Sequence, residues 1–211
     1  MRLIKKPEAK ALAEAGELIR AGKVVLYPTE TLYGLGADAM NAQAVAQVRQ
    51  MKGRPDDDPI PVIVMDRDML KKLVTKVDLI AERLVGAFWP GPLTIIFDAR
   101  QYIPTELTAN TGAIGVRIPD SRIAIELVRS AGRPLTATSA NLSGKKPPAT
   151  VKEILSQLIE EPAMVIDAGI LPPSLPSTVV DPRGGKVKIL RQGAIPEKAI
   201  MEVIAGTGAC E

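Results

Sequence analysis

The sequence predicts an α/β fold in which a mixed β-sheet is flanked by helices. Short apolar runs typical of strands alternate with amphipathic stretches typical of helices along the whole chain. No internal repeat, low-complexity tract or clear linker interrupts that alternation. Because 211 residues fit one large domain, we expect residues 1–211 to form a single domain, with its motifs between about residues 10 and 200.

Helices are predicted where apolar side chains recur at helical spacing and where capping or breaking residues stand at the ends. In chain order they are Pro7–Ala21, ended by Gly22; a helix capped by Asn41 that buries Val45, Val48 and Met51; Met69–Val74; Asp78–Phe88, ended by Trp89-Pro90-Gly91-Pro92; Ser121–Ala131; Val151–Ile159, with Thr150 and Glu153 as a capping box; and a last helix opened by Pro196 at its first position.

Strands are predicted where short runs of β-branched and other apolar residues are bounded by turn residues. In chain order they are Val24–Tyr27, Val62–Met65, Leu93–Phe97, Ile114–Ile118, Leu135–Thr138, Met164–Ile166, Thr178–Asp181 and, after the turn Arg183-Gly184-Gly185, Val187–Leu190. A polar loop is expected from the end of the third strand to about Gly112.

The composition excludes several kinds of catalytic site. The chain has no histidine and one cysteine, Cys210, which excludes Ser-His-Asp chemistry, zinc sites built from histidine or a cysteine cluster, and an intramolecular disulfide. The N-terminus lacks a signal-peptide core and no apolar run reaches about 18 residues, so we expect a cytoplasmic protein without a membrane partner. The 27 basic and 24 acidic residues suit nucleotides or tRNA, and equally solubility alone.

The segment from Tyr27 to Pro59 carries the first candidate site. Thr29, Thr31 and Gly34-Leu35-Gly36 follow directly on the strand Val24–Tyr27, in what we interpret as a Thr- and Gly-rich loop. A glycine turn at a strand end is the simpler reading, and no complete dinucleotide fingerprint or P-loop follows. Open α/β sheets nevertheless place ligands where strands end, which favours a ligand-facing loop.

Lys52 and Arg54 stand two residues apart at the end of the helix that follows Asn41. Basic residues at a helix C-terminus are also explained by the helix dipole alone. Pro55 should stop the helix and force an extended exit, which would present both side chains from one corner. An ammonium and a guanidinium there could hold different oxygens of a phosphate-bearing molecule.

Two further clusters place polar side chains at strand ends. The loop Ser139-Ala140-Asn141-Leu142-Ser143-Gly144 follows the strand Leu135–Thr138, and Lys145-Lys146 adds charge beside it. Serine and asparagine also cap helices and turns, so capping is an equal alternative. Arg117 lies inside the apolar run Ile114–Ile118, where an arginine needs a partner. It either points to solvent or, as we favour, faces a pocket and binds a carboxylate or phosphate.

Seven segments together resemble the YrdC-like family of threonylcarbamoyl-adenylate synthases. They are, in order, YPTETLYGLGADA, KGRPDDDP, WPGPLT, GVRIP, TSANLSG, STVVD and ILRQGAIP. The resemblance runs from about Val24 to Pro196 and implies the single-domain form, with a twisted mixed sheet and helices in three layers. It also implies a synthase that converts ATP, L-threonine and bicarbonate into threonylcarbamoyl-AMP and pyrophosphate. A downstream threonylcarbamoyl-transfer complex would then modify an adenosine beside the tRNA anticodon.

The same resemblance assigns roles to individual residues. Thr31 would touch the threonine substrate, Arg117 would hold its carboxylate and Ser177 would close over it. The catalytic signature KxR…SxN, formed here by Lys52, Arg54, Ser139 and Asn141, would cradle the nucleotide phosphates. The rest of the ATP site would be lined by Asp58, the loop near Ala113, Pro147 and Arg191. Mg²⁺ is expected on the phosphates, held by ATP and water, with no metal site built by the protein.

Two other functions stay open at this stage. Many relatives have a histidine near the threonine where this chain has Ile63, so the chain could be a paralogue that acts on another acyl substrate. It could also be a module that grips tRNA or double-stranded RNA through its basic loops, without synthase activity. Scarce aromatic side chains and the small net charge of +3 argue against RNA binding as the sole role.

Overall fold

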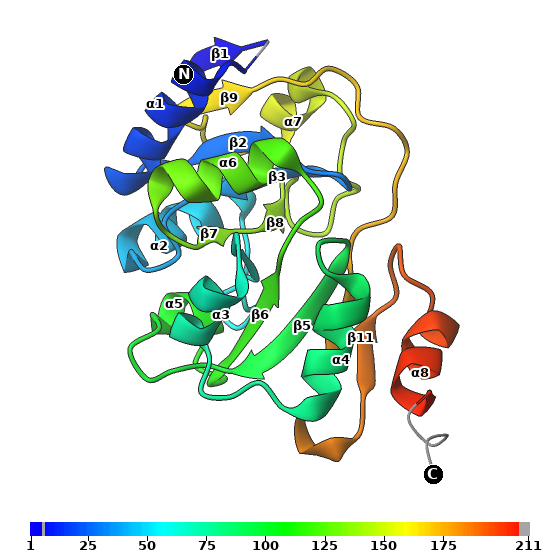
Figure 1. The fold of residues 1–211 in the computed structure, drawn as a ribbon. Helices are drawn as coiled ribbons and strands as arrows, with labels where there is room; N and C mark the ends of the chain where they lie inside the picture. The colour runs from blue at the N-terminus through cyan, green and yellow to red at the C-terminus, as the bar shows by residue number, and fades with distance from the viewer. Residues whose placement is uncertain (6, 207–211) are drawn as a thin grey trace.

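The computed structural model describes residues 1–5 and 7–206, so Cys210 lies outside the described residues. The strands of this part of the chain form two mixed sheets, which lie one above the other in Figure 1. In spatial order, the first sheet consists of β1 (Arg2–Ile4), β9 (Met164–Ile166), β2 (Val25–Pro28), β3 (Tyr33–Gly36) and β8 (Thr138–Ser139). The second consists of β11 (Lys188–Arg191), β10 (Thr178–Asp181), β5 (Leu93–Asp98), β6 (Ala113–Arg117), β4 (Val62–Ile63) and β7 (Leu135–Thr136).

Both sheets combine parallel and antiparallel pairs, which confirms the α/β class with mixed pairing. In the first sheet, β9 runs parallel to β1 and β2, while β3 runs antiparallel to β2 and β8. In the second, β10 is parallel to β5 and β4 is parallel to β6, and the remaining neighbours are antiparallel. The difference from the sequence prediction is that the strands divide into two sheets.

The division occurs inside one segment that the sequence predicts as a single strand, Leu135–Thr138. Its first half, β7, pairs with β4 in the second sheet, and its second half, β8, pairs with β3 in the first. Between them, the amide of Ala137 donates to the carbonyl of Pro61 at 2.8 Å. This crossing brings the end of β8 and the loop after it to the junction of the two sheets.

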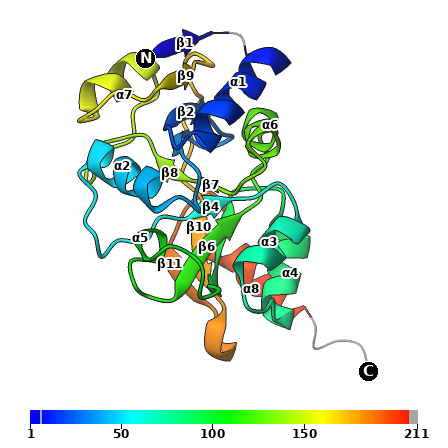
Figure 2. The same cartoon turned by 90° about the vertical axis from the view of Figure 1, so that its left-hand side faces the viewer.

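Helices cover both faces of the first sheet (Figure 2). One face carries α1 (Ala9–Arg20) and α6 (Arg122–Ala131), and the other carries α2 (Ala42–Lys52) and α7 (Val151–Gln157). Beside the second sheet lie α3 (Arg67–Leu73), α4 (Leu79–Phe88) and α8 (Glu197–Ala205), with the short helix α5 (Thr105–Thr108) against α2 and a single 3₁₀ turn, η1, at Arg183–Gly185. The expected three-layer arrangement is therefore present around the first sheet.

Most helix starts agree with the capping residues in the sequence. Asn41 Oδ1 accepts hydrogen bonds from the amides of Gln43 and Ala44, which satisfies two N–H groups at the start of α2. Asp78, Ser121 and Thr150 cap α4, α6 and α7 in the same way. The sequence prediction missed β1 and α5, and it placed Pro196 inside the last helix, whereas Pro196 is its N-cap.

The Gly-rich segment after Thr31 is a strand, so its prediction as a loop is wrong. Residues Tyr33–Gly36 form β3, which pairs with β2 along its full length. A Cβ atom on Gly36 would lie 2.8 Å from Cε1 of Tyr27, closer than such atoms approach in proteins. Glycine is required here because the strand crosses the buried ring of Tyr27 at contact distance.

The core is mainly aliphatic and extends through both sheets. Its buried side chains are largely Val, Leu, Ile and Ala, and Tyr27 and Tyr33 are the largest of them. Near one end of β5, Phe97 packs against Trp89 with a ring-centroid distance of 6.4 Å. Within the described residues, no helix combines the length and the apolar character needed to cross a membrane.

Candidate functional site

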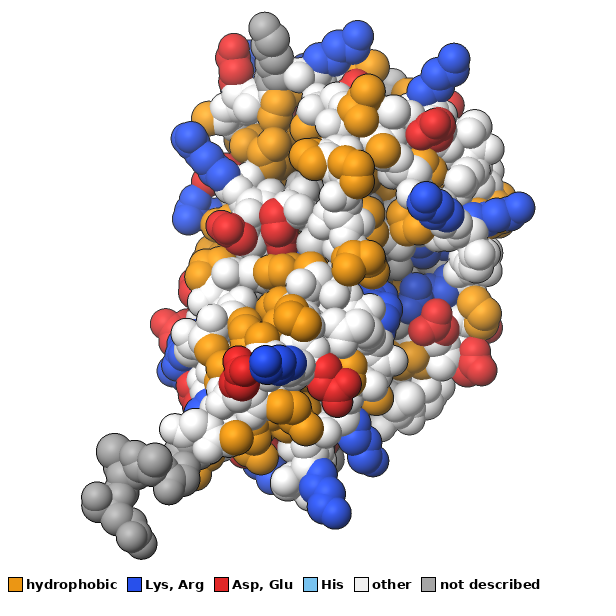
Figure 3. Space-filling model, turned by 90° about the vertical axis from the view of Figure 1, so that its right-hand side faces the viewer, with side chains coloured by type: hydrophobic (Ala, Val, Ile, Leu, Met, Phe, Trp, Pro, Cys, Tyr) orange, Lys and Arg blue, Asp and Glu red, His pale blue; other side chains and the backbone are white. Residues whose placement is uncertain are grey.

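A cavity of about 230 Å³ lies where the two sheets meet. Its wall comes from the turn between β2 and β3, the end of β6, the strand β8 with the loop after it, and the segment before β10. The lining residues are Tyr27, Thr29, Thr31, Leu32, Tyr33, Gly34, Arg54, Pro61, Arg117, Ala137, Thr138, Ser139, Asn141, Lys145, Pro147, Pro176, Ser177 and Arg191. Figure 3 shows basic side chains recessed in a hollow of the molecular surface, with acidic side chains at its edge.

The cavity brings together most of the site residues predicted from the sequence. Eight of them line it, namely Thr31, Arg54, Arg117, Ser139, Asn141, Pro147, Ser177 and Arg191. Three do not, namely Lys52, Asp58 and Ala113. These eight residues are spread over some 160 positions of the sequence, and the two-sheet topology is what collects them.

The turn between β2 and β3 presents the Thr31 hydroxyl in a fixed position. Thr29 Oγ1 accepts hydrogen bonds from the amides of Thr31 and Leu32, both at 3.1 Å, and donates to the carbonyl of Leu32. It also lies 3.0 Å from Thr31 Oγ1. The side chain of Thr29 therefore orders the turn, while Thr31 supplies a buried hydroxyl to the cavity wall.

Arg117 faces this cavity, and its partner belongs to the protein. Nη1 of Arg117 donates to Oε1 of Glu30 at 2.5 Å, and only 7% of the arginine side chain and 18% of the glutamate side chain are exposed. Nε and Nη2 of Arg117 have no hydrogen-bond partner among the described residues. The guanidinium can thus still bind a carboxylate or phosphate through those nitrogens.

Glu30 is a residue that the sequence reasoning missed. Standing between two threonines in a turn, a glutamate has the pattern of a solvated surface residue. The signal in the sequence that could have led to Glu30 is Arg117. An arginine inside an apolar strand requires a buried partner, and a carboxylate of the same chain can be that partner.

Lys52 points into the protein rather than into the cavity. The chain enters a left-handed turn at Gly53 (φ 57°), which ends α2 two residues before Pro55. With 2% of the residue exposed, Lys52 Nζ donates to the carbonyls of Ser139 and Asn141 and lies 3.4 Å from Asn141 Oδ1. Burial, followed by repulsion from Arg54, lowers the pKa of Lys52 to about 7.

The side chains of Ser139 and Asn141 form hydrogen bonds within their own loop. Asn141 Oδ1 accepts from Ser139 Oγ at 2.5 Å, while its Nδ2 donates to the carbonyls of Leu142 and Lys145 at 2.8 and 2.7 Å. Both N–H groups of the Asn141 amide are therefore occupied. The loop forms a rigid support, held from behind by Lys52.

Arg54 lines the cavity with most of its donors already in use. It pairs with Asp58 at 2.9 Å and donates to the carbonyls of Asp58 and Pro59 and to Thr138 Oγ1. Asp58 does not line the cavity itself, but it pairs with Arg54, which does. Burial is the main cause that lowers the pKa of Arg54, and the neighbouring charges of Arg49 and Arg191 lower it further.

Arg191 joins the strand β11 to the segment before β10. Its Nε and Nη2 donate to the carbonyl of Ser177 at 3.2 and 3.0 Å, and Nη2 also donates to Ser177 Oγ at 3.1 Å. Ser177 Oγ in turn lies 2.9 Å from Thr94 Oγ1. Nη1 of Arg191 has no partner within the described part of the chain. Burial, and then the charge of Arg117, lower the pKa of Arg191.

Two residues named by the resemblance lie away from the cavity wall. Ala113 is at the start of β6, while Arg117 is at its end, so a strand of five residues separates Ala113 from the site. Ile63 pairs with Arg117 and Leu135 across β4 and is fully buried in the apolar cluster that contains Tyr27 and Leu135. Ile63 therefore packs the core behind the cavity.

A larger apolar groove adjoins the cavity and shares Thr31, Leu32 and Pro147 with it. The groove has a volume of about 880 Å³ and lies between α7 and the extended segment 171–175. Typical ligand pockets enclose about 300–1,000 Å³, so the cavity alone would hold only part of a nucleotide together with an amino acid. The groove provides the additional room.

The comparisons with known proteins agree with this fold. The model of the Sua5/YciO/YrdC family, described as telomere recombination, matches residues 17–193. A threonylcarbamoyl-AMP synthase of Pyrococcus abyssi is 36% identical over 190 residues, which are 90% of this chain and 56% of that protein. One of Bacillus subtilis is 37% identical over 194 residues, covering 92% of this chain and 56% of that protein. The chain thus spans little more than half the length of these two relatives.

Solved structures give the same result. The crystal structure of P. abyssi Sua5 complexed with L-threonine has a TM-score of 0.91 and 34% identity, covering 97% of this chain and 60% of that one. E. coli YciO has a TM-score of 0.83 and 27% identity, covering 94% of this chain and 97% of that one. With the family model matching most of its length, this chain belongs to the Sua5/YciO/YrdC family.

Proposed function

We propose that this protein is a threonylcarbamoyl-AMP synthase, which forms threonylcarbamoyl-AMP and pyrophosphate from ATP, L-threonine and bicarbonate. The observation that carries the proposal is a single cavity lined by Arg117, which is paired with a glutamate of the protein, and by three further cationic side chains, Arg54, Arg191 and Lys145. We assign Arg117 and the Thr31 hydroxyl to an amino-acid end of the cavity, and Arg54, Arg191 and Lys145 with the Ser139–Asn141 loop to a phosphate end. Relatives of 36% and 37% identity are threonylcarbamoyl-AMP synthases, and one related structure holds L-threonine.

The amino acid would bind at the Arg117 end. Its carboxylate would accept from the nitrogens of Arg117 that Glu30 leaves unused, as paired charged hydrogen bonds. Thr31 and Ser177, which also line the cavity, would supply hydroxyls for the amine and the side-chain hydroxyl of threonine. Because Ile63 packs the core and does not line the cavity, it imposes no contact that would reject threonine.

The nucleotide phosphates would bind at the other end, through the donors that internal hydrogen bonds leave over. These are Nη1 of Arg191, the remaining N–H of Arg54 Nη1 and the ammonium of Lys145, for which the described residues provide no partner. We assign Lys52 and Asn141 a supporting role, since their donors are already used inside the protein. The apolar groove beside Pro147 would take the parts of the nucleotide that the cavity cannot hold.

The chemistry asks for alignment and charge neutralisation rather than a strong base. The threonine amine and bicarbonate give a carbamate and water. A carbamate oxygen then forms a bond to the α-phosphorus as the bond to the β-phosphate oxygen breaks, and pyrophosphate leaves. Arg54 and Arg191 would neutralise the charge that grows on the leaving oxygens, and Arg117 would hold the carbamate at its carboxylate end.

Mg²⁺ and the later partners belong to the same proposal. The described residues contain no group of three or more acidic, cysteine or histidine side chains placed to hold a metal. We therefore propose that Mg²⁺ arrives on the phosphates, which are its usual ligands together with water. It would supply further charge neutralisation of the phosphates. The product would pass to a transfer complex that modifies tRNA.

The deciding experiment incubates the protein with ATP, Mg²⁺, labelled bicarbonate and L-threonine. We expect threonine-dependent pyrophosphate release and a labelled adduct that contains AMP. Parallel reactions with serine, glycine and no amino acid separate a threonine synthase from a paralogue with another acyl substrate. Pyrophosphate release that does not depend on any amino acid, without a labelled adduct, would contradict the proposal.

A further inference from the structure

Glu30 has a feature that no other described residue shares. Its Oε2 is a buried side-chain oxygen without any hydrogen-bond partner. Its other oxygen is bound to Arg117, and the residues on either side of it in the chain, Thr29 and Thr31, line the cavity. A buried carboxylate oxygen that lacks a donor costs about 1–3 kcal/mol or more, so this arrangement indicates a function other than stability.

The charges around the cavity differ between its two ends. Arg117 is balanced by Glu30, and Arg54 is balanced by Asp58. Arg191 and Lys145 have no carboxylate partner within the described part of the chain. The cations of the cavity that lack an ion-pair partner are therefore Arg191 and Lys145, while the charge of Arg117 is largely neutralised by Glu30.

We propose that Glu30 is a positioning and specificity residue that reserves the Arg117 end for an amino acid and excludes phosphate from it. This inference rests on the proposed function, because it concerns which of two substrates occupies each end. An arginine without a carboxylate partner is a strong phosphate ligand. Glu30 occupies one nitrogen of Arg117, and Nε and Nη2 are left without a partner among the described residues for a ligand of the cavity that Arg117 lines.

The preference follows from the total charge of each ligand. A phosphate at Arg117 would bring its full negative charge close to the carboxylate of Glu30, in a partly buried site where screening is weak. Threonine binds, before its amine reacts, as a zwitterion whose carboxylate and ammonium charges cancel, so the repulsion from Glu30 is offset at the binding step. Arginine thus binds an amino acid where it is paired with a glutamate, and phosphates where it has no such partner.

The first test counts phosphate sites by isothermal titration calorimetry, with inorganic phosphate as the probe. The wild-type protein is expected to bind phosphate at one site, near Arg191 and Lys145. Glu30→Gln, which keeps the shape and removes the charge, is expected to gain a second site. The double variant Glu30→Gln with Arg117→Met should return to one site. An unchanged single site in Glu30→Gln would overturn the proposal.

The second test uses kinetics. In Glu30→Gln we expect the KM for L-threonine to rise about tenfold or more, with a smaller change in kcat, and phosphate to become a competitive inhibitor against L-threonine. Glu30→Asp keeps the charge on a shorter side chain, so it should still exclude phosphate at that end, although its threonine KM rises. Inhibition by phosphate that stays non-competitive with threonine in Glu30→Gln would overturn the proposal.

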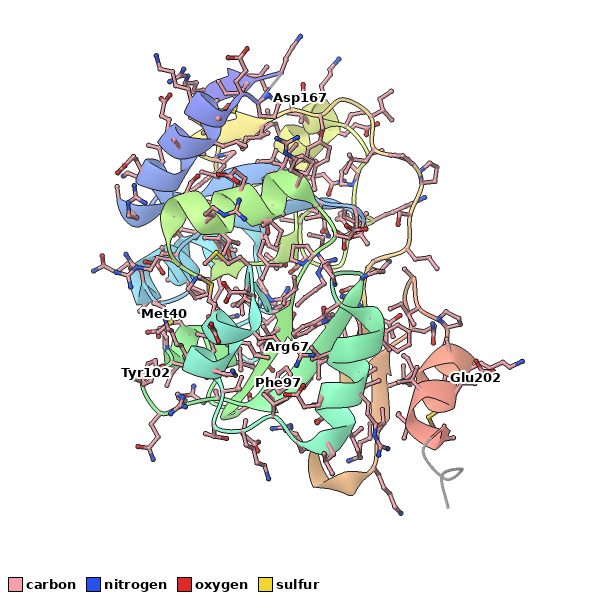
Figure 4. All side chains as sticks on the ribbon, viewed as in Figure 1. Met40, Arg67, Phe97, Tyr102, Asp167 and Glu202 are labelled. Atoms are coloured by element: carbon pink, nitrogen blue, oxygen red, sulfur yellow. The ribbon has the colours of Figure 1, made fainter. Side chains whose placement is uncertain are left out.

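Glu82→Gln is the matched control. Glu82 on α4 pairs with Arg67 on α3 at 2.7 Å, and both side chains are about half exposed and do not line the cavity. Arg67 is labelled in Figure 4. Glu82→Gln should leave the number of phosphate sites and both KM values unchanged. The count of phosphate sites does not need turnover, so a protein that makes no adduct would contradict the proposed function and still leave the role of Glu30 testable. Thermal unfolding of each variant separates loss of folding from loss of selectivity.

Discussion

The two ends of the cavity use the same side-chain chemistry in opposite ways. At the amino-acid end, one arginine is buried and neutralised by a glutamate of the protein. At the phosphate end, Arg191 and Lys145 have no ion-pair partner among the described residues and keep donors for a ligand, and Arg54 adds one further N–H. The comparison teaches that the partner of an arginine, more than the arginine itself, determines which anion it is suited to bind.

The two ends also differ in how they are supported from behind. Glu30 supports the first end by an ion pair with a residue of the cavity wall. Lys52 supports the second end by hydrogen bonds to the backbone of the Ser139–Asn141 loop, so its charge acts on the loop and not on a ligand. Replacing Glu30 should therefore affect mainly the binding of the amino acid, and replacing Lys52 mainly the binding of the nucleotide.

The largest effect is expected from Arg117→Ala. Loss of charged hydrogen bonds to a carboxylate should lower kcat/KM for L-threonine by about 100-fold. The change also leaves the Glu30 carboxylate buried without a partner, so the free energy of unfolding should fall by about 3 kcal/mol. Denaturant unfolding and steady-state kinetics measure the two effects. The KM for ATP should change little. An equal loss of kcat/KM for L-threonine and for ATP would mean that Arg117 does not serve the amino acid alone.

Arg67→Ala is the control for the stability part of that prediction. It breaks the exposed pair with Glu82, where the free energy of unfolding should change by only about 0.5 kcal/mol. A comparable loss of stability in both variants would mean that burial of the Arg117–Glu30 pair has no special consequence.

Lys52→Met should affect the phosphate end and the pH dependence of stability. Below about pH 7, Lys52 is protonated in both the folded and the unfolded state. Between about pH 7 and its ordinary pKa of 10.5, the unfolded chain keeps a proton that the folded protein has released. The free energy of unfolding therefore contains a contribution that rises with pH across this window. Above 10.5 the contribution is constant.

The measurement compares denaturant unfolding of the wild type and Lys52→Met at several pH values. The difference in unfolding free energy between them should change with pH in favour of the wild type from about pH 7 upwards. At constant pH, the variant should show a higher KM for ATP, because the Ser139–Asn141 loop loses its clamp. A pH-independent difference would show that Lys52 does not titrate in this window.

The sequence was sufficient for what depends on neighbouring residues. Helix periodicity and the caps at Asn41 and Thr150 are local signals, and these helices are confirmed. The helices predicted from Asp78 and Ser121 are confirmed as well, with these two residues as their N-caps. The loop prediction for Tyr33–Gly36 was wrong because two glycines give no strand signal, and only the ring of Tyr27 on the paired strand explains them.

The direction of individual side chains at the site depends on distant residues and could not be predicted. The pattern of Lys52 and Arg54 suggested two exposed cations, yet a left-handed residue at Gly53 lets the chain present Arg54 while Lys52 stays inside. Glu30 and Arg117 meet although 87 positions separate them. Which strands lie side by side decided these contacts, and that requires the tertiary structure.

A smaller effect is expected from Arg191→Lys, which keeps the charge and removes the planar fork. The lysine cannot donate to the Ser177 carbonyl and hydroxyl in the arrangement of Nε and Nη2. Since we assign Ser177 to the amino acid and Arg191 holds it directly, the KM for L-threonine should rise about tenfold and the KM for ATP less. Arg191→Met should raise both. A larger rise in the KM for ATP than in the KM for L-threonine in Arg191→Lys would indicate that Ser177 contacts the nucleotide instead.

The smallest effect is expected from Lys145→Ala. Lys145 is exposed, and its ammonium contributes charge to the phosphate end without being held in one geometry by a described partner. An exposed cation contributes about 0.2–1 kcal/mol, so the KM for ATP should rise no more than about fivefold, with the KM for L-threonine unchanged. Because exposed charges are screened by salt, the difference from the wild type should shrink as the salt concentration rises. Lys186→Ala is the matched control, because Lys186 is exposed and lines neither the cavity nor the groove. A salt-insensitive loss in Lys145→Ala, or an equal loss in Lys186→Ala, would mean that the phosphate end does not attract its ligand through the charge of Lys145.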